Sequence, residues 1–170
     1  MGSFIAVDSQ RCTGCKTCQL LCSLYHFGES NPLKSAIHVI RRERDGLVFC
    51  LPLVCQQCGH APCVEACPTG ALVKSEGSGI LALNEEECSA CGLCEDACSL
   101  GCIAFGADGL DLINCDLCGG EPQCVPACHA LCLSVVDTSE RNERQNMHYL
   151  AALLQTEGLQ DRILGRRVLQ

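Results

Sequence analysis

The stretch CTGCKTCQLLC, residues 12–22, holds four cysteines in the spacing C-x2-C-x2-C-x3-C, and the same spacing returns in residues 88–98. Two further groups match each other, CQQCGHAPCVEAC at residues 55–67 and CDLCGGEPQCVPAC at residues 115–128. The two types alternate along the chain, and self-similarity of this kind indicates an internal repeat. The chain is therefore predicted to consist of similar units, each organised around its cysteines.

Short apolar runs precede all four groups, at residues 4–8, 46–54, 79–83 and 109–113. Runs rich in Val, Ile and Leu favour β-strands, and the segments after the third cysteine suit short helices. Residues 34–54 alternate in polarity on either side of Arg44-Asp45-Gly46, which predicts a β-hairpin. The expected fold is α+β, with a repeated unit of strand, cysteine loop and short helix.

The composition indicates that sulfur replaces part of a conventional core. Among 170 residues there are 19 cysteines and no Trp, and aromatic residues make up 4% of the chain. The N-terminus lacks the basic and apolar regions of a secretory signal, so a cytoplasmic location is expected. Disulfides are disfavoured there, and a thiol-rich pattern points instead to metal binding or catalysis.

Charge and hydropathy limit the partners. No stretch reaches the roughly 18 apolar residues that a membrane span requires, and the formal charge of −8 argues against nucleic acid or an anionic membrane as the main partner. A basic docking face on another protein is the expected complement.

Residues 137–170 form a cysteine-free tail. Met147, Leu150, Leu153 and Leu154 recur at helical spacing, Ser139 suits an N-cap, and Gly158 suits a stop. An amphipathic helix is predicted, whose apolar stripe either covers the chain's own core or docks a partner subunit.

The cysteine spacing favours an iron–sulfur cluster over zinc. Structural zinc takes four tetrahedral ligands, usually as two separated pairs, whereas three cysteines within seven residues can hold three corners of one cubane. The fourth cysteine of such a run reaches the other cluster in two-cluster ferredoxins. His60 and His129 lie beside ligand positions and are expected to hydrogen-bond a ligand rather than bind iron; His26, His38 and His148 are expected to be surface or packing residues.

These motifs resemble those of the polyferredoxin subunits that serve tungsten and molybdenum oxidoreductases, over about residues 4–136. FCLPLVCQQCGHAPCVEACPTGAL, residues 49–72, resembles the second cluster motif of iron–sulfur subunits in the dimethyl sulfoxide reductase family. INCDLCGGEPQCVPAC, residues 113–128, is similar to small ferredoxin subunits found with tungsten-dependent aldehyde oxidoreductases.

The resemblance implies nested, tandem ferredoxin-like modules that bind four 4Fe–4S clusters. An outer module (residues 1–30 and 106–136) would pair the first group with the fourth, and an inner module (residues 47–105) the second with the third, with the hairpin 34–54 inserted in a domain of residues 1–136. Sequence alone also allows neighbouring groups to pair. The ligand sets implied by the nested pairing are Cys12, Cys15, Cys18 and Cys128; Cys115, Cys118, Cys124 and Cys22; Cys55, Cys58, Cys63 and Cys98; and Cys88, Cys91, Cys94 and Cys67.

Three cysteines remain outside these sets. We call the last cysteine of each group, which is predicted to bind the cluster of another group, the crossing cysteine. Cys102 and Cys132 follow their crossing cysteines by four residues, the position that Ala71 fills in the second group, and Cys50 lies in a predicted strand. A small buried residue is expected at such positions, and Cys behaves as a small hydrophobe. Packing is therefore the favoured role for all three.

The sequence contains no motif typical of an enzyme that makes or breaks bonds in a substrate. The sequence has no nucleophile elbow, dinucleotide fingerprint or P-loop, so the chain is expected to be a non-catalytic electron relay. The resemblance implies a tungsten or molybdenum pterin catalytic subunit as one partner and a flavin (NAD-linked) subunit, a soluble acceptor or further copies of the same chain as another. The alternatives are a relay for a hydrogenase or a formate- or carbon monoxide-oxidising complex, a structural zinc protein, and a redox sensor that uses Cys102 or Cys132.

Overall fold

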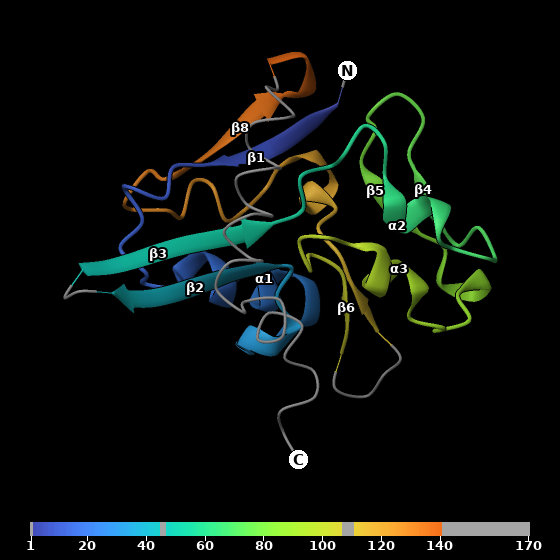
Figure 1. Cartoon of the computed structure of the whole chain (residues 1–170), viewed down its shortest axis with the longest axis horizontal. Helices are drawn as coiled ribbons and strands as arrows, with labels where there is room; N and C mark the ends of the chain where they lie inside the picture. Colours follow the sequence, from blue (N-terminus) through green and yellow to red (C-terminus); the bar gives the residue numbers. More distant parts are fainter. Residues whose placement is uncertain (1, 45–46, 107–110, 141–170) are drawn as a thin grey trace.

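The computed structural model describes residues 2–44, 47–106 and 111–140 of the chain. Within these residues the predicted α+β fold is confirmed as four antiparallel two-stranded sheets joined by short helices (Figure 1). The predicted tail helix beyond Glu140 lies outside the described residues. The strands are β1 (Ser3–Val7), β2 (Ile37–Arg44), β3 (Leu47–Val54), β4 (Leu72–Lys74), β5 (Leu81–Leu83), β6 (Ala104–Phe105), β7 (Leu112–Ile113) and β8 (Leu133–Asp137). The α-helices are α1 (Thr17–Phe27), α2 (Pro62–Glu65) and α3 (Leu93–Ala97), and the 3₁₀ turns are η1 (Pro32–Lys34), η2 (Glu85–Glu87), η3 (Leu117–Gly120) and η4 (Thr138–Glu140).

The first and last described strands pair with each other. β1 runs antiparallel to β8, in a register from Ser3 opposite Asp137 to Val7 opposite Leu133. Ile5, in the middle of β1, is fully buried. This sheet brings the loop after β1, which contains the first cysteine group, next to the segment that follows the fourth group.

The predicted hairpin is confirmed. β2 and β3 pair from Ile37 opposite Val54 onward, and their turn residues 45–46 lie outside the described part. Ile37, Leu51 and Leu53 are buried, and α1 packs against β2. The helix ends at Gly28, whose φ of 68° is left-handed and whose N–H bonds the carbonyl of Leu24.

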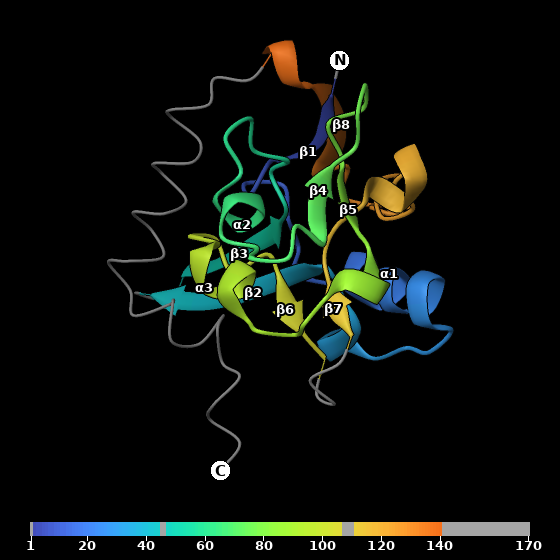
Figure 2. The same ribbon diagram turned by 90° about the vertical axis from the view of Figure 1, so that its right-hand side faces the viewer.

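The middle of the chain forms a second, smaller assembly. The short helices α2 and α3 pack on each other, close to the β4–β5 and β6–β7 sheets (Figure 2). The strands that were expected before the third and fourth cysteine groups are present as β5 and β7. The order of strand, cysteine loop and short α-helix is therefore realised in the first three groups, whereas turns at residues 123–127 replace the expected helix in the fourth.

The core combines aliphatic side chains with sulfur. Ile37, Leu72, Ile103 and Leu117 are almost fully buried, and they belong to one cluster that also contains many of the cysteines. The expectation that sulfur replaces part of the core is confirmed. No helix in the described part of the chain has the length and hydropathy that crossing a bilayer requires.

Candidate iron–sulfur sites

The four cysteine loops share one backbone feature. The residue directly before the second cysteine of each group has a positive φ: 72° at Gly14, 47° at Gln57, 52° at Ala90 and 55° at Leu117. A non-glycine residue in this region costs about 1–3 kcal/mol, yet three of the four are not glycine. Left-handed residues turn successive backbone N–H groups toward one concave side, which suits an anionic guest. The fold thus accepts strain in three of the four cysteine loops to form the same cradle.

The four predicted ligand sets are set 1 (Cys12, Cys15, Cys18, Cys128), set 2 (Cys115, Cys118, Cys124, Cys22), set 3 (Cys55, Cys58, Cys63, Cys98) and set 4 (Cys88, Cys91, Cys94, Cys67).

The structure brings sulfurs of the first and fourth groups together. Cys18 interacts electrostatically with Cys128 as well as with the nearby members of its own group. Cys124 interacts with Cys22, and so does Cys115. One cavity is lined by all four cysteines of set 1, and another by all four of set 2. The set 2 cavity therefore faces four cysteines, the donor number that a cubane requires, and the set 1 cavity faces five, because Cys132 lines it as well.

Sulfurs of the second and third groups also meet. Cys63 interacts electrostatically with Cys98, and Cys94 interacts with Cys67 and Cys91. These contacts connect the members that sets 3 and 4 require, although the cysteines come from separate loops. Segments far apart in the sequence thus supply neighbouring sulfurs.

Contacts between the sets give them a spatial order. Cys124 of set 2 interacts with Cys18 of set 1, Cys55 of set 3 interacts with Cys115 of set 2, and Cys94 of set 4 interacts with Cys63 of set 3. The sets therefore follow one another as 1, 2, 3 and 4, with sets 1 and 4 at the two ends.

Burial controls the acidity of the thiols. It raises the pKa of Cys18 and Cys63 to about 11 and the pKa of Cys115 and Cys124 to about 12. A thiol in such surroundings stays neutral near pH 7 unless a positive charge stabilises the thiolate, and a coordinated metal does this. The donor set and its burial both fit a metal cluster.

Cys102 and Cys132 are buried, as expected, but they also contact predicted ligands. The Sγ atoms of Cys132 and Cys128 are 3.4 Å apart, and the N–H of Cys132 donates to Cys128 Sγ at 3.4 Å. The N–H of Cys102 donates to Cys98 Sγ at 3.3 Å, and a hydrogen bond from the Cys102 side chain is the main reason that the pKa of Cys98 falls to about 6. Both extra thiols therefore lie beside a crossing cysteine.

Cys50 packs against the first cysteine loop. A Cβ added at Gly14 would lie 2.5 Å from Cys50 Sγ, so no larger residue fits at position 14 without movement. The left-handed φ at Gly14 also favours glycine, but the equivalent positions Gln57, Ala90 and Leu117 tolerate a side chain, so the close approach of Cys50 is the feature particular to Gly14. Cys50 is buried, which agrees with its predicted packing role.

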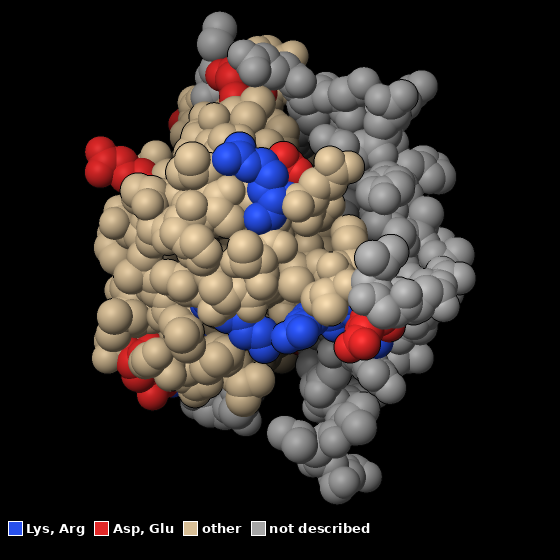
Figure 3. All heavy atoms as spheres, turned by 90° about the vertical axis from the view of Figure 1, so that its left-hand side faces the viewer, with Lys and Arg blue, Asp and Glu red and all other residues tan. Residues whose placement is uncertain are grey.

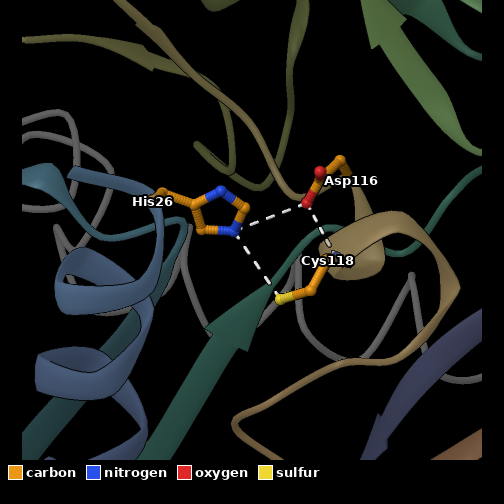
Figure 4. A group of neighbouring side chains, drawn as sticks. All are labelled: His26, Asp116 and Cys118. Atoms are coloured by element: carbon orange, nitrogen blue, oxygen red, sulfur yellow. Dashed lines mark hydrogen bonds and ion pairs between the residues drawn. The ribbon is translucent and has the colours of Figure 1, made fainter. Parts of the chain in front are cut away.

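Two histidines contact predicted ligands, and only one of them, His129, was expected to do so. His129 Nδ1 lies 3.7 Å from Cys15 Sγ, in agreement with its predicted role. His60 instead forms an ion pair with Glu65 at 2.8 Å, and its side chain is 77% exposed. His26 Nε2 lies 3.6 Å from Cys118 Sγ and 3.5 Å from Asp116 Oδ1 (Figure 4).

The expectation that His26 is only a surface or packing residue therefore missed a contact. His26 follows Cys22 by four residues, as Cys102 follows Cys98 and Cys132 follows Cys128, and this shared offset was a signal in the sequence. The ligand atoms of His26, Asp116 and Cys118 lie within 4.8 Å of one another and could hold a single ion. Such a site would use Cys118, which set 2 needs as a cluster ligand. A hydrogen bond from His26 to Cys118 therefore explains the contact better than an ion site does.

Gln57, which the sequence did not single out, joins two cysteine loops. Its side chain is 2% exposed. The amide nitrogen donates to the carbonyl of Cys115 at 2.6 Å, and the amide oxygen accepts from the N–H of Leu81 at 3.0 Å. Lys74 donates to the carbonyls of Gln57 and Cys58. Gln57 thus fixes the loop of set 3 against the loop of set 2.

Comparisons with known proteins agree on the class of site. A family model described as a 4Fe-4S dicluster domain matches residues 47–138. The chain is 40% identical over 126 residues to a Pyrococcus furiosus protein named aliphatic sulfonate oxidoreductase, polyferredoxin-like subunit, covering 74% of this chain and 71% of that one. It is 31% identical over 166 residues to the Escherichia coli electron transport protein HydN, covering 82% and 91%. Among solved structures, a chain of the active-site complex BamBC of benzoyl coenzyme A reductase matches with a TM-score of 0.47 and 24% identity, covering 96% of this chain and 95% of that one.

Proposed function

Since the chain belongs to the 4Fe-4S dicluster domain family and is a non-catalytic iron–sulfur electron-transfer subunit of an oxidoreductase complex, we propose a relay of four clusters. Each 4Fe–4S cluster would pass single electrons to the next in series. The observation that carries this proposal is the order of the four sulfur sets. Neighbouring sets share electrostatic contacts, so a path leads from set 1 to set 4 without a break.

The proposed ligands are the sixteen cysteines of sets 1 to 4. Sets 1 and 2 would belong to the outer module that the β1–β8 sheet closes, and sets 3 and 4 to the inner module. One cavity lined by the four cysteines of set 2, and another lined by those of set 1 together with Cys132, support the outer pair. Contacts from Cys63 to Cys98 and from Cys94 to Cys67 support the inner pair.

A bound cubane cluster exchanges one electron at a potential set by charge, hydrogen bonds and exposure. The chain's own residues supply these influences. The left-handed loop residues aim backbone N–H groups inward, the N–H groups of Cys102 and Cys132 bond crossing sulfurs, and burial excludes water from Cys55 and Cys115 at the junction of the two pairs. Exclusion of water keeps the environment fixed while charge moves, which lowers the cost of reorganisation.

We further propose that the relay serves a tungsten or molybdenum pterin catalytic subunit of the aldehyde oxidoreductase type and passes electrons to a flavin (NAD-linked) subunit or a soluble acceptor in the cytoplasm. Similarity to a polyferredoxin-like subunit of an oxidoreductase supports a catalytic partner. Tungsten, molybdenum and pterin in the complex purified with the tagged chain would identify the partner; a nickel-containing partner would indicate a hydrogenase relay instead.

Iron analysis tests the cluster count. Protein prepared without oxygen is expected to contain about sixteen iron and about sixteen sulfide per chain, and its reduced EPR spectrum should show broad signals from interacting spins. About eight of each would reduce the relay to one pair of clusters. Zinc without sulfide would contradict electron transfer altogether.

Replacing Cys132 by Ala, the residue that naturally stands at the equivalent position 71, separates tuning from ligation. We expect unchanged iron content and a lower reduction potential for one cluster, because the Cys128 sulfur loses its thiol neighbour while the backbone N–H bond remains. Potentiometric titration followed by EPR measures this. A drop of about four iron per chain would instead identify Cys132 as the ligand.

A further inference from the structure

The electron path has two ends, and they differ in the charges around them. Among the nineteen cysteines only Cys15 and Cys91 are exposed. Cys15 belongs to set 1 and Cys91 to set 4, the two sets that lie at the ends of the spatial order. An exposed ligand at each end gives an external redox partner close access there, whereas the cysteines of sets 2 and 3 are buried or half-buried.

Basic side chains lie in the loop that carries Cys15 and on the hairpin that lines the same cavity. Arg11 and Lys16 are exposed in the loop that carries Cys15, and Arg41 is exposed on β2. The closest carboxylate in the sequence, Asp8, accepts a hydrogen bond from the N–H of Gln10. Leu131, 66% exposed, and the exposed His129, which contacts Cys15, complete this surface. We call Arg11, Lys16, Arg41, His129 and Leu131 the set 1 face.

The charge distribution seen from this side agrees with that description. Figure 3 views the molecule from the left-hand side of Figure 1, where β2 ends and β3 begins, and the loop from β1 to α1 lies on the same side. Lys and Arg atoms form two groups on this face, and most of the visible Asp and Glu atoms lie toward its rim. A basic face is unexpected on a chain with a formal charge of −8.

The opposite end carries the other sign. Glu85, Glu86 and Glu87 are exposed directly before Cys88 of set 4, and Asp96 is exposed on α3. The chain is therefore polarised along its electron path. A partner that docks productively at one end would be repelled at the other, because complementary charge speeds encounter and like charge opposes it.

Resting on the proposed relay, we propose that the set 1 face is the docking surface for an acidic face of a partner redox subunit, which exchanges electrons with the cluster at Cys15. This differs from the expectation, drawn from net charge, that the partner's docking face would be basic. Exposed Leu131 supplies an apolar contact within a basic rim, and that combination is typical of transient protein interfaces.

The polarity can be measured with two small one-electron oxidants of opposite charge. Reduced protein is mixed with the anionic cobalt(III)–EDTA complex or with the cationic hexaamminecobalt(III) ion in a stopped-flow instrument. In each reaction a reduced cluster loses one electron and cobalt(III) becomes cobalt(II). Lys16→Glu is compared with Lys34→Glu, which makes the same charge change beyond the other end of α1.

Lys16→Glu should slow oxidation by the anionic complex about threefold at low salt, and Arg11→Glu with Lys16→Glu about tenfold, because electrostatic steering is lost. Near 0.5 M salt these effects should largely vanish. Lys34→Glu should have little effect, and none of the variants should slow the cationic oxidant. Equal effects of Lys16→Glu and Lys34→Glu would overturn the proposal.

Two controls separate the possible failures. Iron and sulfide are measured on every sample, so missing clusters would count against the relay itself, whereas intact clusters with unchanged rates would count against the set 1 face alone. Sedimentation of the unmodified chain and of Lys16→Glu tests self-association. Salt-sensitive dimers that Lys16→Glu abolishes would identify a second copy of the chain as the occupant and overturn the assignment to a different subunit.

Discussion

A chain that carries both Cys22→Ala and Cys124→Ala is expected to lose only one cluster. In the nested arrangement both residues belong to set 2, so the second substitution removes nothing that the first has left in place. Iron should fall from about sixteen to about twelve per chain, in the double variant as in each single variant. Pairing between neighbouring groups would put the two cysteines on different clusters and would leave about eight.

The mirrored pair Cys22→Ala with Cys63→Ala provides the control. These residues belong to sets 2 and 3, so the nested arrangement predicts two lost clusters, whereas neighbour pairing predicts one. Iron and sulfide analysis under anaerobic conditions, with EPR of the reduced proteins, distinguishes the patterns. The nested assignment fails if the mirrored pair retains more iron than Cys22→Ala with Cys124→Ala.

Replacing Gln57 by Leu is expected to destabilise the protein by about 3 kcal/mol. The substitution removes the partners of the Cys115 carbonyl and the Leu81 N–H, which lie in buried surroundings, and each buried polar group left without a partner costs about 1–3 kcal/mol. Because Gln57 connects the loops of sets 2 and 3, electron exchange between the outer and inner pairs should slow as well. Thermal unfolding of the holoprotein measures the first effect, and freeze-quench EPR the second.

Gln123→Leu is the matched control for this substitution. Its amide also donates to a backbone carbonyl, that of Glu121 at 2.7 Å, but the bond is local and exposed. Unfolding temperatures that fall equally in the two variants would show that the hydrogen bonds of Gln57 between the two modules add nothing to the stability of the protein. A normal unfolding temperature for Gln57→Leu would have the same meaning.

Local patterns in the sequence were sufficient for the parts of the site that lie close together along the chain. The cysteine spacing and the apolar run before each group predict loops and strands, and the structure contains those strands as β1, β3, β5 and β7. Such features depend on alternation and on turn residues within a few positions. The hairpin of β2 and β3 belongs to the same class, since its turn and both strands are contiguous.

Contacts between distant segments were not accessible in this way. The pattern assigns no strand to residues 133–137, because the strand there depends on pairing with β1. Gln56 and Gln57 are adjacent and chemically identical, and only the packed structure shows that Gln57 reaches Cys115. The contact of His26 could likewise not be predicted, because its partner Cys118 is distant in the sequence and lies beside it only in the folded structure.

The pairing of β1 with β8 also determines when the protein can complete its folding during synthesis. β1 leaves the ribosome well before β8 and has no partner until residues 133–137 have been made, whereas the central sheets close over short stretches of chain. Contacts between distant segments form more slowly because a longer loop must be closed. The middle of the chain should therefore mature first, and the earliest cysteines should remain open to oxygen and stray metals for longest. A chain truncated before Leu133 would retain this exposure permanently, which would make it a ready substrate for cellular proteases.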